Sequence, residues 1–95
     1  MTSKSSSKSK KYIKELSWVK RGKQRREIIV HIVGTKTPTE ISKKSGYSLN
    51  HTSKVLNEFR KHNLVKLLNP EDKTGRLYQL TEKGKVVRDE ILEEE

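Results

Sequence analysis

The sequence contains no cysteine, and it has only two prolines and five glycines among its 95 residues. Without cysteine, disulfides, cysteine-ligated zinc and thiol nucleophiles are excluded, and the absence fits a reducing compartment. Uncharged stretches are short: Ile28 to Thr35 runs for eight residues, whereas about 20 apolar residues are needed to cross a bilayer. The N-terminus also lacks the apolar stretch of a signal peptide. We therefore expect a cytoplasmic protein that does not contact membranes.

Apolar residues are scarce as well, at 29% of the chain, and alanine is absent. Leu, Ile, Val and Phe still supply 23 side chains, which exceeds the level of about 20% below which a disordered chain is expected. A chain this short holds one domain, because two separate cores would each be too small to be stable. The composition therefore predicts one small folded domain with a lean core.

Positive charge dominates the sequence. The 22 Lys and Arg residues exceed the 12 Asp and Glu residues and give a formal net charge of +10. Residues 1–27 carry +8, residues 28–88 carry +7, and the last seven residues carry −5. Clustered cations neutralise phosphates and release their counterions, so this layout favours a polyanionic partner such as nucleic acid.

The N-terminal segment differs from the rest of the chain. Its first eleven residues, MTSKSSSKSKK, have no apolar side chain after Met1. They cannot bury surface to offset the entropy of ordering, so we predict a disordered Lys/Ser-rich tail at 1–11 and a folded domain at 12–95. Tyr12, Ile13, Leu16 and Val19 then recur at helical spacing and predict a short amphipathic helix near 11–19.

A second helix is predicted at about 21–33. The basic run from Lys20 to Arg26 leads into Ile28, Ile29, Ile32 and Val33, which share one helical face, and Gly34 is the expected stop signal. A strand over Ile28 to Val33 is the competing interpretation, because β-branched residues lower helix propensity. No turn signal separates the basic run from the apolar one, which favours the helix.

The next helix has a clear start signal. Thr37-Pro38-Thr39-Glu40 has the pattern of a capping box with proline at the first helical position. A short helix at 38–45 follows, and Gly46 ends it.

Ser48 offers another N-cap directly after this turn, and Asn63 can adopt the left-handed conformation that closes a helix at about 48–62. The apolar stripe of this helix is formed by Leu49, Thr52, Val55, Leu56 and Phe59. Two helices joined across Gly46-Tyr47-Ser48 match the helix-turn-helix pattern.

The sequence period changes after Asn63. Leu64 to Leu68 predicts a strand, and Arg76 to Leu80 alternates polar and apolar side chains as a returning strand does. Turn-forming residues fill the segment between them, so we predict a β-hairpin with a long tip, or wing, at about 69–76. Thr81 can cap a last helix at about 82–93, whose carboxylate-rich end opposes the helix dipole and should fray.

This order of elements is that of a winged helix-turn-helix domain, a mainly α fold with a small β-hairpin (α+β). The resemblance extends to the residues, since roughly 18–92 is similar to small archaeal and bacterial winged-helix transcriptional regulators related to the MarR and ArsR types. The segments that carry it are Ser48 to Phe59, His62-Asn63-Leu64-Val65, Gly75-Arg76-Leu77-Tyr78 and Leu80-Thr81-Glu82-Lys83-Gly84.

The resemblance implies a nucleoid-associated regulator that binds double-stranded DNA, with helix 48–62 in the major groove and the wing on the flanking backbone. It also implies a homodimer, and spare apolar residues near both ends of the domain favour one. These residues are Tyr12, Ile13, Leu16, Trp18, Val87 and Ile91.

Helical geometry places Asn50, Lys54, Asn57 and Lys61 opposite the core of this helix, with His51 beside them. Asn pairs bidentately with adenine, and Lys donates to guanine or to phosphate. Because they lie on the first turns, we expect Asn50, His51 and Lys54 to contact bases. Further DNA contacts are expected from Ser48, Tyr47 and Thr39 at phosphates, from Lys73 and Arg76 on the wing, and from Arg21 and Lys23 at the second helix.

Two of these expectations have alternatives. The outward face of helix 48–62 can be a solvated surface without a ligand, and Arg76 fits equally well as a link between the wing and the body. Two other functions also remain open: a non-specific architectural protein that coats DNA, and a winged-helix module that binds protein partners in the transcription machinery.

Other chemistry finds little support in the sequence. His31 falls on the apolar side of its helix, as a packed histidine does. His51 and His62 are about 16 Å apart along one helix, too far to share a metal. No glycine-rich phosphate loop precedes a helix, and the paired carboxylates stand at the terminus. We expect no enzyme activity, no metal and no cofactor, and nothing indicates a small-molecule effector.

Overall fold

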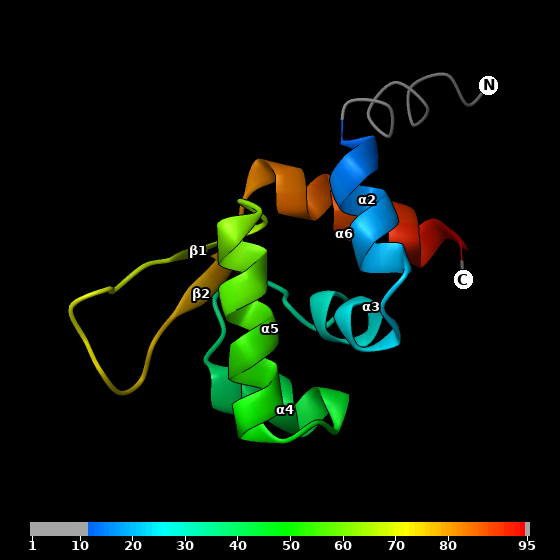
Figure 1. Cartoon of the computed structure of the whole chain (residues 1–95). Helices are drawn as coiled ribbons and strands as arrows, with labels where there is room; N and C mark the ends of the chain where they lie inside the picture. Colours follow the sequence, from blue (N-terminus) through cyan, green and yellow to red (C-terminus); the bar gives the residue numbers. More distant parts are fainter. Residues whose placement is uncertain (1–11, 95) are drawn as a thin grey trace.

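The computed structural model describes residues 12–94, and the predicted tail at 1–11 lies outside that range. The described elements are, in order, α2 (Ile13–Lys20), α3 (Lys23–Ile29), α4 (Pro38–Ser45), α5 (Leu49–Lys61), β1 (Val65–Leu67), β2 (Tyr78–Leu80) and α6 (Glu82–Glu94). Helix α5 runs through the centre, with the hairpin on one side, α2, α3 and α6 on the other, and α4 beside its N-terminal end (Figure 1). This is the winged helix-turn-helix arrangement, so the predicted fold class is confirmed.

The helix-turn-helix forms where its caps predicted it. The Thr37 hydroxyl accepts from the Glu40 backbone N–H at 3.2 Å, and the Glu40 carboxylate accepts from the Thr37 backbone N–H at 2.9 Å. Gly46 ends α4 with φ of 85°, a conformation that favours glycine. The Ser48 hydroxyl then accepts from the His51 backbone N–H at 3.1 Å and starts α5. Local hydrogen bonding therefore fixes both ends of the turn.

Helix α3 is shorter than the predicted helix at 21–33. The first residues of that range, Arg21 and Gly22, are the C-cap of α2 and the N-cap of α3. After Ile29 the backbone tightens, because His31 and Ile32 donate to carbonyls three residues back, at 3.1 Å each. The competing strand does not form either. The tight turn keeps Ile32 in the core although it is outside the helix.

Strands β1 and β2 pair in antiparallel register, with Val65 opposite Leu80 and Leu67 opposite Tyr78. A third segment joins them through Lys36, whose backbone N–H donates to the Tyr78 carbonyl at 2.9 Å and whose carbonyl accepts from the Tyr78 N–H at 2.8 Å. No sequence pattern predicts this bridge, which attaches the base of the wing to the segment that precedes α4.

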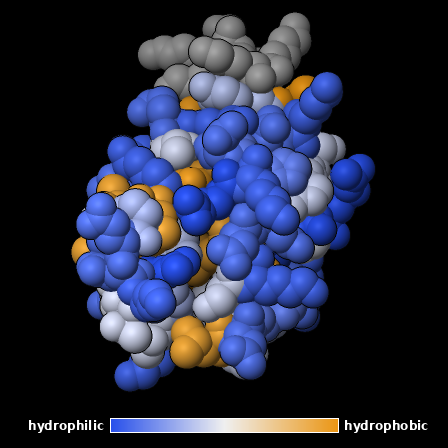
Figure 2. All heavy atoms as spheres, turned by 60° about the vertical axis from the view of Figure 1, so that its left-hand side comes forward, coloured by the Kyte–Doolittle hydropathy of each residue, from blue (hydrophilic) through white to orange (hydrophobic). Residues whose placement is uncertain are grey.

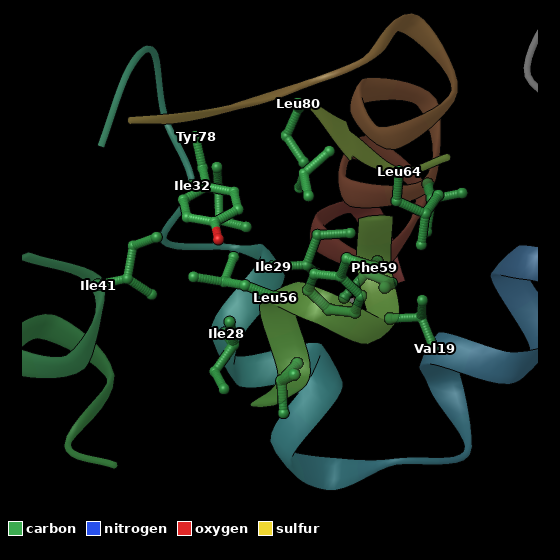
Figure 3. Packing of buried hydrophobic residues seen from close by; sticks show 14 of the residues in the cluster. Val19, Ile28, Ile29, Ile32, Ile41, Leu56, Phe59, Leu64, Tyr78 and Leu80 are labelled. Carbon is green, nitrogen blue, oxygen red and sulfur yellow. The ribbon is translucent and has the colours of Figure 1, made fainter. Parts of the chain in front are cut away.

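One core holds the elements together (Figure 3). Phe59 and Leu56 of α5 meet Ile28, Ile29 and Ile32 on one side, while Leu64, Tyr78 and Leu80 close the core beneath the hairpin. Of the five residues in the predicted apolar stripe of α5, Thr52, Val55, Leu56 and Phe59 are buried, and Leu49 is exposed.

The apolar residues expected to be spare for a dimer are mostly used within the chain, so the expectation that they are spare is wrong. Leu16, Val87 and Ile91 are buried in the core, and Tyr12 and Trp18 pack against it. The Trp18 ring stacks on His62, with centroids 3.9 Å apart, and meets Phe59 edge-on. Of the six residues, Ile13 is the one with a large exposed fraction, 56%. Because the chain has few apolar residues, the core uses most of these six side chains.

Helix α6 is attached at both ends. The Thr81 hydroxyl donates to the Asn63 carbonyl at 2.6 Å and accepts from the Gly84 N–H at 3.1 Å, as an N-cap does. At the other end, Lys20 of α2 forms an ion pair with Glu94 at 2.9 Å. The C-terminal carboxylates therefore include one that ties α6 to α2.

Candidate nucleic-acid interface

The exposed side of α5 forms a polar ridge. It consists of Asn50, Lys54, Asn57 and Lys61, all of which are exposed. They lie opposite the buried residues of the same helix, as their spacing predicted. Two open hollows flank this ridge, one on the α3 side and one on the wing side.

The first, the α3 hollow, has a volume of about 480 Å³. It separates the start of α3 from α5 and is lined by Gly22, Lys23, Gln24, Arg25, Tyr47, His51, Lys54, Val55 and Glu58. Three cations, Lys23, Arg25 and Lys54, face one carboxylate, Glu58, across this space. The hollow is therefore net positive.

The second, the wing hollow, has a volume of about 460 Å³. Helices α4 and α5 and the wing line it through Thr37, Pro38, Thr39, Leu49, Ser53, Asn57, Lys73, Thr74, Gly75, Arg76 and Tyr78. Its charged members, Lys73 and Arg76, are both cations, and its other polar members are hydroxyls and an amide. Seen from the side of the wing, the molecular surface is largely hydrophilic, with apolar patches that are small and separate (Figure 2).

The wing owes its shape to Asn69. The Asn69 side-chain oxygen accepts from the Leu77 N–H at 2.8 Å, and its amide donates to the Gly75 carbonyl at 3.1 Å and to the Asp72 carboxylate at 3.0 Å. The Arg76 Nε donates to the Asp72 carbonyl at 3.3 Å. Arg76 therefore holds the tip of the wing itself, while it also lines the wing hollow. Asn69 is one of the turn-forming residues of the predicted tip, and its three hydrogen bonds give it a specific role there.

Two of the predicted contact residues turn inward. The Tyr47 hydroxyl donates to the Glu27 carboxylate of α3, and this bond raises the pKa of Tyr47 above the ordinary tyrosine value. The His51 ring lies 5.4 Å from the Tyr47 ring, and its Nε2 is buried without a hydrogen-bond partner. A base contact by His51 would require its ring to leave the α3 hollow. Ser48 and Thr39 remain exposed.

The basic cluster at the start of α3 divides into two groups. Lys20 pairs with Glu94, and Arg26 donates to the Lys20 carbonyl. Arg25 donates to the Trp18 carbonyl at 2.6 Å, and its guanidinium lies 4.3 Å from the Trp18 ring. Arg25 and Arg26 hold α3 against α2, and Lys20 ties α2 to α6. Arg21 and Lys23 are instead exposed, and they are the two residues of this cluster from which DNA contacts are expected.

The described residues, 12–94, form neither a metal site nor a membrane-spanning helix. No group of three or more His, Cys, Asp or Glu side chains in this range is placed to hold a metal ion. None of the helices in the same range combines the length and apolar character required to cross a membrane.

Comparisons with known proteins identify solved structures that have a similar fold. No protein-family model and no curated protein matches the chain. Among solved structures, it is similar to NadR in complex with 4-hydroxyphenylacetate, with a TM-score of 0.67 and 22% identity over 94% of this chain. It is also similar to a MarR variant from E. coli in complex with operator DNA, with a TM-score of 0.65 and 22% identity over 93% of this chain.

In both comparisons the chain spans 65% of the length of the solved protein. The chain therefore has the winged helix-turn-helix fold of the MarR-type regulators.

Proposed function

We propose that this chain is a transcriptional regulator that binds double-stranded DNA with sequence specificity. The observation that carries the proposal is the polar ridge of α5 between two cation-lined hollows. A helix in the major groove has its outer face against base edges and a phosphate backbone on either side. The ridge and the two hollows offer complementary chemistry to these three features.

The proposal gives each predicted contact residue a place. Asn50 and Lys54, on the first turns of α5, contact base edges, and Asn57 and Lys61 continue the ridge. Lys23 and Arg21 meet phosphates beyond the α3 hollow, while Lys73, Arg76, Thr39 and Ser48 meet them on the wing side. His51 and Tyr47 contribute first by holding α5 against α3, and His51 reaches a base only if its ring turns outward.

The test is selection of bound sequences from a random duplex library, followed by affinity measurements with single variants. Asn50→Ala should weaken binding to the selected sequence by roughly 5- to 150-fold, the equivalent of about 1–3 kcal/mol for a lost base contact. On random DNA the same variant should bind nearly as well as the wild type.

Lys61→Ala provides the matched control, because this ridge residue lies at the C-terminal end of α5, away from the base edges. It should weaken binding to all sequences alike, as a lost phosphate contact does. If selection yields no preferred sequence and Asn50→Ala has no effect, the chain is a non-specific architectural protein. If binding to a protein partner survives loss of the whole ridge while DNA is not bound, the chain is an interaction module.

We also propose that the regulator is a homodimer. Ile13 on α2 and Leu92 on α6, with exposed fractions of 56% and 48%, supply apolar surface on two neighbouring helices. A dimer would present two α5 helices to half-sites about one DNA turn apart. Sedimentation analysis of the free protein should then give twice the chain mass, and Ile13→Glu should return it to the mass of one chain.

A further inference from the structure

Leu49 is the first residue of α5, and 48% of its surface is exposed. The other large apolar side chains that are exposed in the described range are Ile13, Val33, Leu68 and Leu92, none of which belongs to α5. The core does not account for Leu49, since α5 contributes Thr52, Val55, Leu56 and Phe59 to it, and Ser48 already caps the helix.

The position of Leu49 is set by its neighbours on the helix. It lines the wing hollow together with Ser53 and Asn57, which follow it at intervals of four residues along the same face. Pro38 lines the same hollow and adds apolar surface. The next residue after Leu49 is Asn50, at the start of the polar ridge. Leu49 thus lies at the border between the wing hollow and the polar ridge that we assign to base edges, since Asn57 belongs to both.

We infer that Leu49 contacts the C5-methyl group of a thymine and makes the regulator prefer an A·T pair at that position. Leucine has no hydrogen-bonding group, so the base-edge feature it can recognise in the major groove is the apolar one, and among the four bases thymine alone presents a methyl group there. Asn50 beside it can pair with the adenine of the same or the adjacent base pair. This inference rests on the proposed function, since it needs α5 in the major groove.

The experiment uses duplexes that carry the selected sequence, with each thymine of one half-site replaced in turn by deoxyuridine. Deoxyuridine keeps every hydrogen-bonding group of thymine and lacks only the methyl. For the wild type, one of these replacements should weaken binding by about fourfold, the factor that corresponds to burying one methyl-sized group. Leu49→Ala should bind the thymine and deoxyuridine duplexes with equal affinity at that position.

Leu68→Ala is the matched control, because Leu68 is the same residue type with a similar exposed fraction, 44%, and lines neither hollow. It should retain the full thymine preference. Circular dichroism melting of both variants checks that the fold is unchanged.

Two outcomes would overturn the inference alone: a selected sequence that is insensitive to every deoxyuridine, and a Leu49→Ala variant as sensitive to deoxyuridine as the wild type. Absence of any selected sequence would overturn the proposed function, and the inference with it.

Discussion

At the scale of single residues, Gly84 shows how closely α6 approaches the hairpin. A Cβ atom built at Gly84 would lie 2.1 Å from the Leu64 carbonyl oxygen, so no other residue fits without moving the backbone. Thr81 acts at the same junction, because its hydroxyl binds the Asn63 carbonyl and caps α6. The Thr-Glu-Lys-Gly segment therefore serves to dock the last helix beneath the wing.

Gly84→Ala should destabilise the fold by about 1–3 kcal/mol, the usual cost of overpacking a site that cannot expand. Urea unfolding followed by circular dichroism measures this change. Lys85→Ala, on the exposed side of the same turn, should change the free energy of unfolding by less than about 0.5 kcal/mol. An equal loss in both variants would show that the close approach of Gly84 to Leu64 does not account for the destabilisation.

Glu40 makes the α4 cap sensitive to acid. The backbone N–H of Thr37 donates to its carboxylate and lowers the pKa of Glu40, and the nearby Lys36 charge lowers it further. A carboxylate whose pKa is lowered by folding stabilises the protein above its ordinary pKa, and this stabilisation is lost as pH falls through the lower, folded-state pKa. The melting temperature of Glu40→Gln should therefore lie below that of the wild type at pH 7 and converge with it on acidification. Glu71→Gln, on the exposed wing, should show no such convergence.

At the scale of elements, α5 is held from two directions. At its N-terminal end, Tyr47 connects the turn to α3 through Glu27, and the Ser42 hydroxyl donates to the Tyr47 carbonyl at 2.6 Å. At its C-terminal end, His62 stacks on Trp18 of α2. These contacts fix the orientation of the ridge relative to the helices behind it.

Tyr47→Phe should lower stability, because it leaves the Glu27 carboxylate without the hydroxyl that donates to it. The pKa of Tyr47 is raised in the folded state, so the bond stabilises the protein below the ordinary tyrosine pKa of about 10 and is lost as pH rises through the higher, folded-state value. The difference in urea midpoint between wild type and variant should thus be present at pH 7 and shrink in strong alkali. Combining Tyr47→Phe with Glu27→Gln should cost less than the sum of the two single changes.

The elements with local signals were those that the sequence predicted well. Thr37, Gly46, Ser48 and Asn63 act through their own side chains or backbone angles, and the structure shows each in its expected place. The end of α3 depends instead on how Ile32 reaches the core. The apolar spacing alone therefore predicts a helix that is longer than α3. The inward position of the His51 ring depends on Tyr47 and on α3, and the Lys36 bridge depends on the returning strand. Both features arise from contacts between distant segments, so no local sequence pattern predicts them.

At the scale of the whole molecule, the distribution of charge supports the proposed orientation on DNA. The acidic C-terminal end of α6 lies beside α2, where Glu94 pairs with Lys20, and a second ion pair joins Lys83 to Glu15 at 3.6 Å. The ridge lies on the exposed face of α5, and neither hollow is lined by a residue of α6. The Glu94 carboxylate thus neutralises a cation of α2 and leaves the cations around α5 for a polyanion.

The salt dependence of DNA binding should report the two hollows separately. Each phosphate contact contributes about 0.9 to the slope of log affinity against log salt concentration. Lys23→Ala in the α3 hollow and Lys73→Ala in the wing hollow should each reduce the slope by about this amount, and the double variant by about twice as much. Lys14→Ala, on α2, should leave the slope unchanged. An unchanged slope in both hollow variants would mean that the DNA backbones do not occupy these hollows.

Arg25 gives the molecule a built-in optical signal. Its guanidinium covers one face of Trp18, the single tryptophan of the chain, and the same side chain lines the α3 hollow. A phosphate that draws Arg25 toward the hollow would uncover the indole ring and alter its emission. Fluorescence of the unlabelled protein can therefore follow occupation of this one hollow, in real time and independently of the wing.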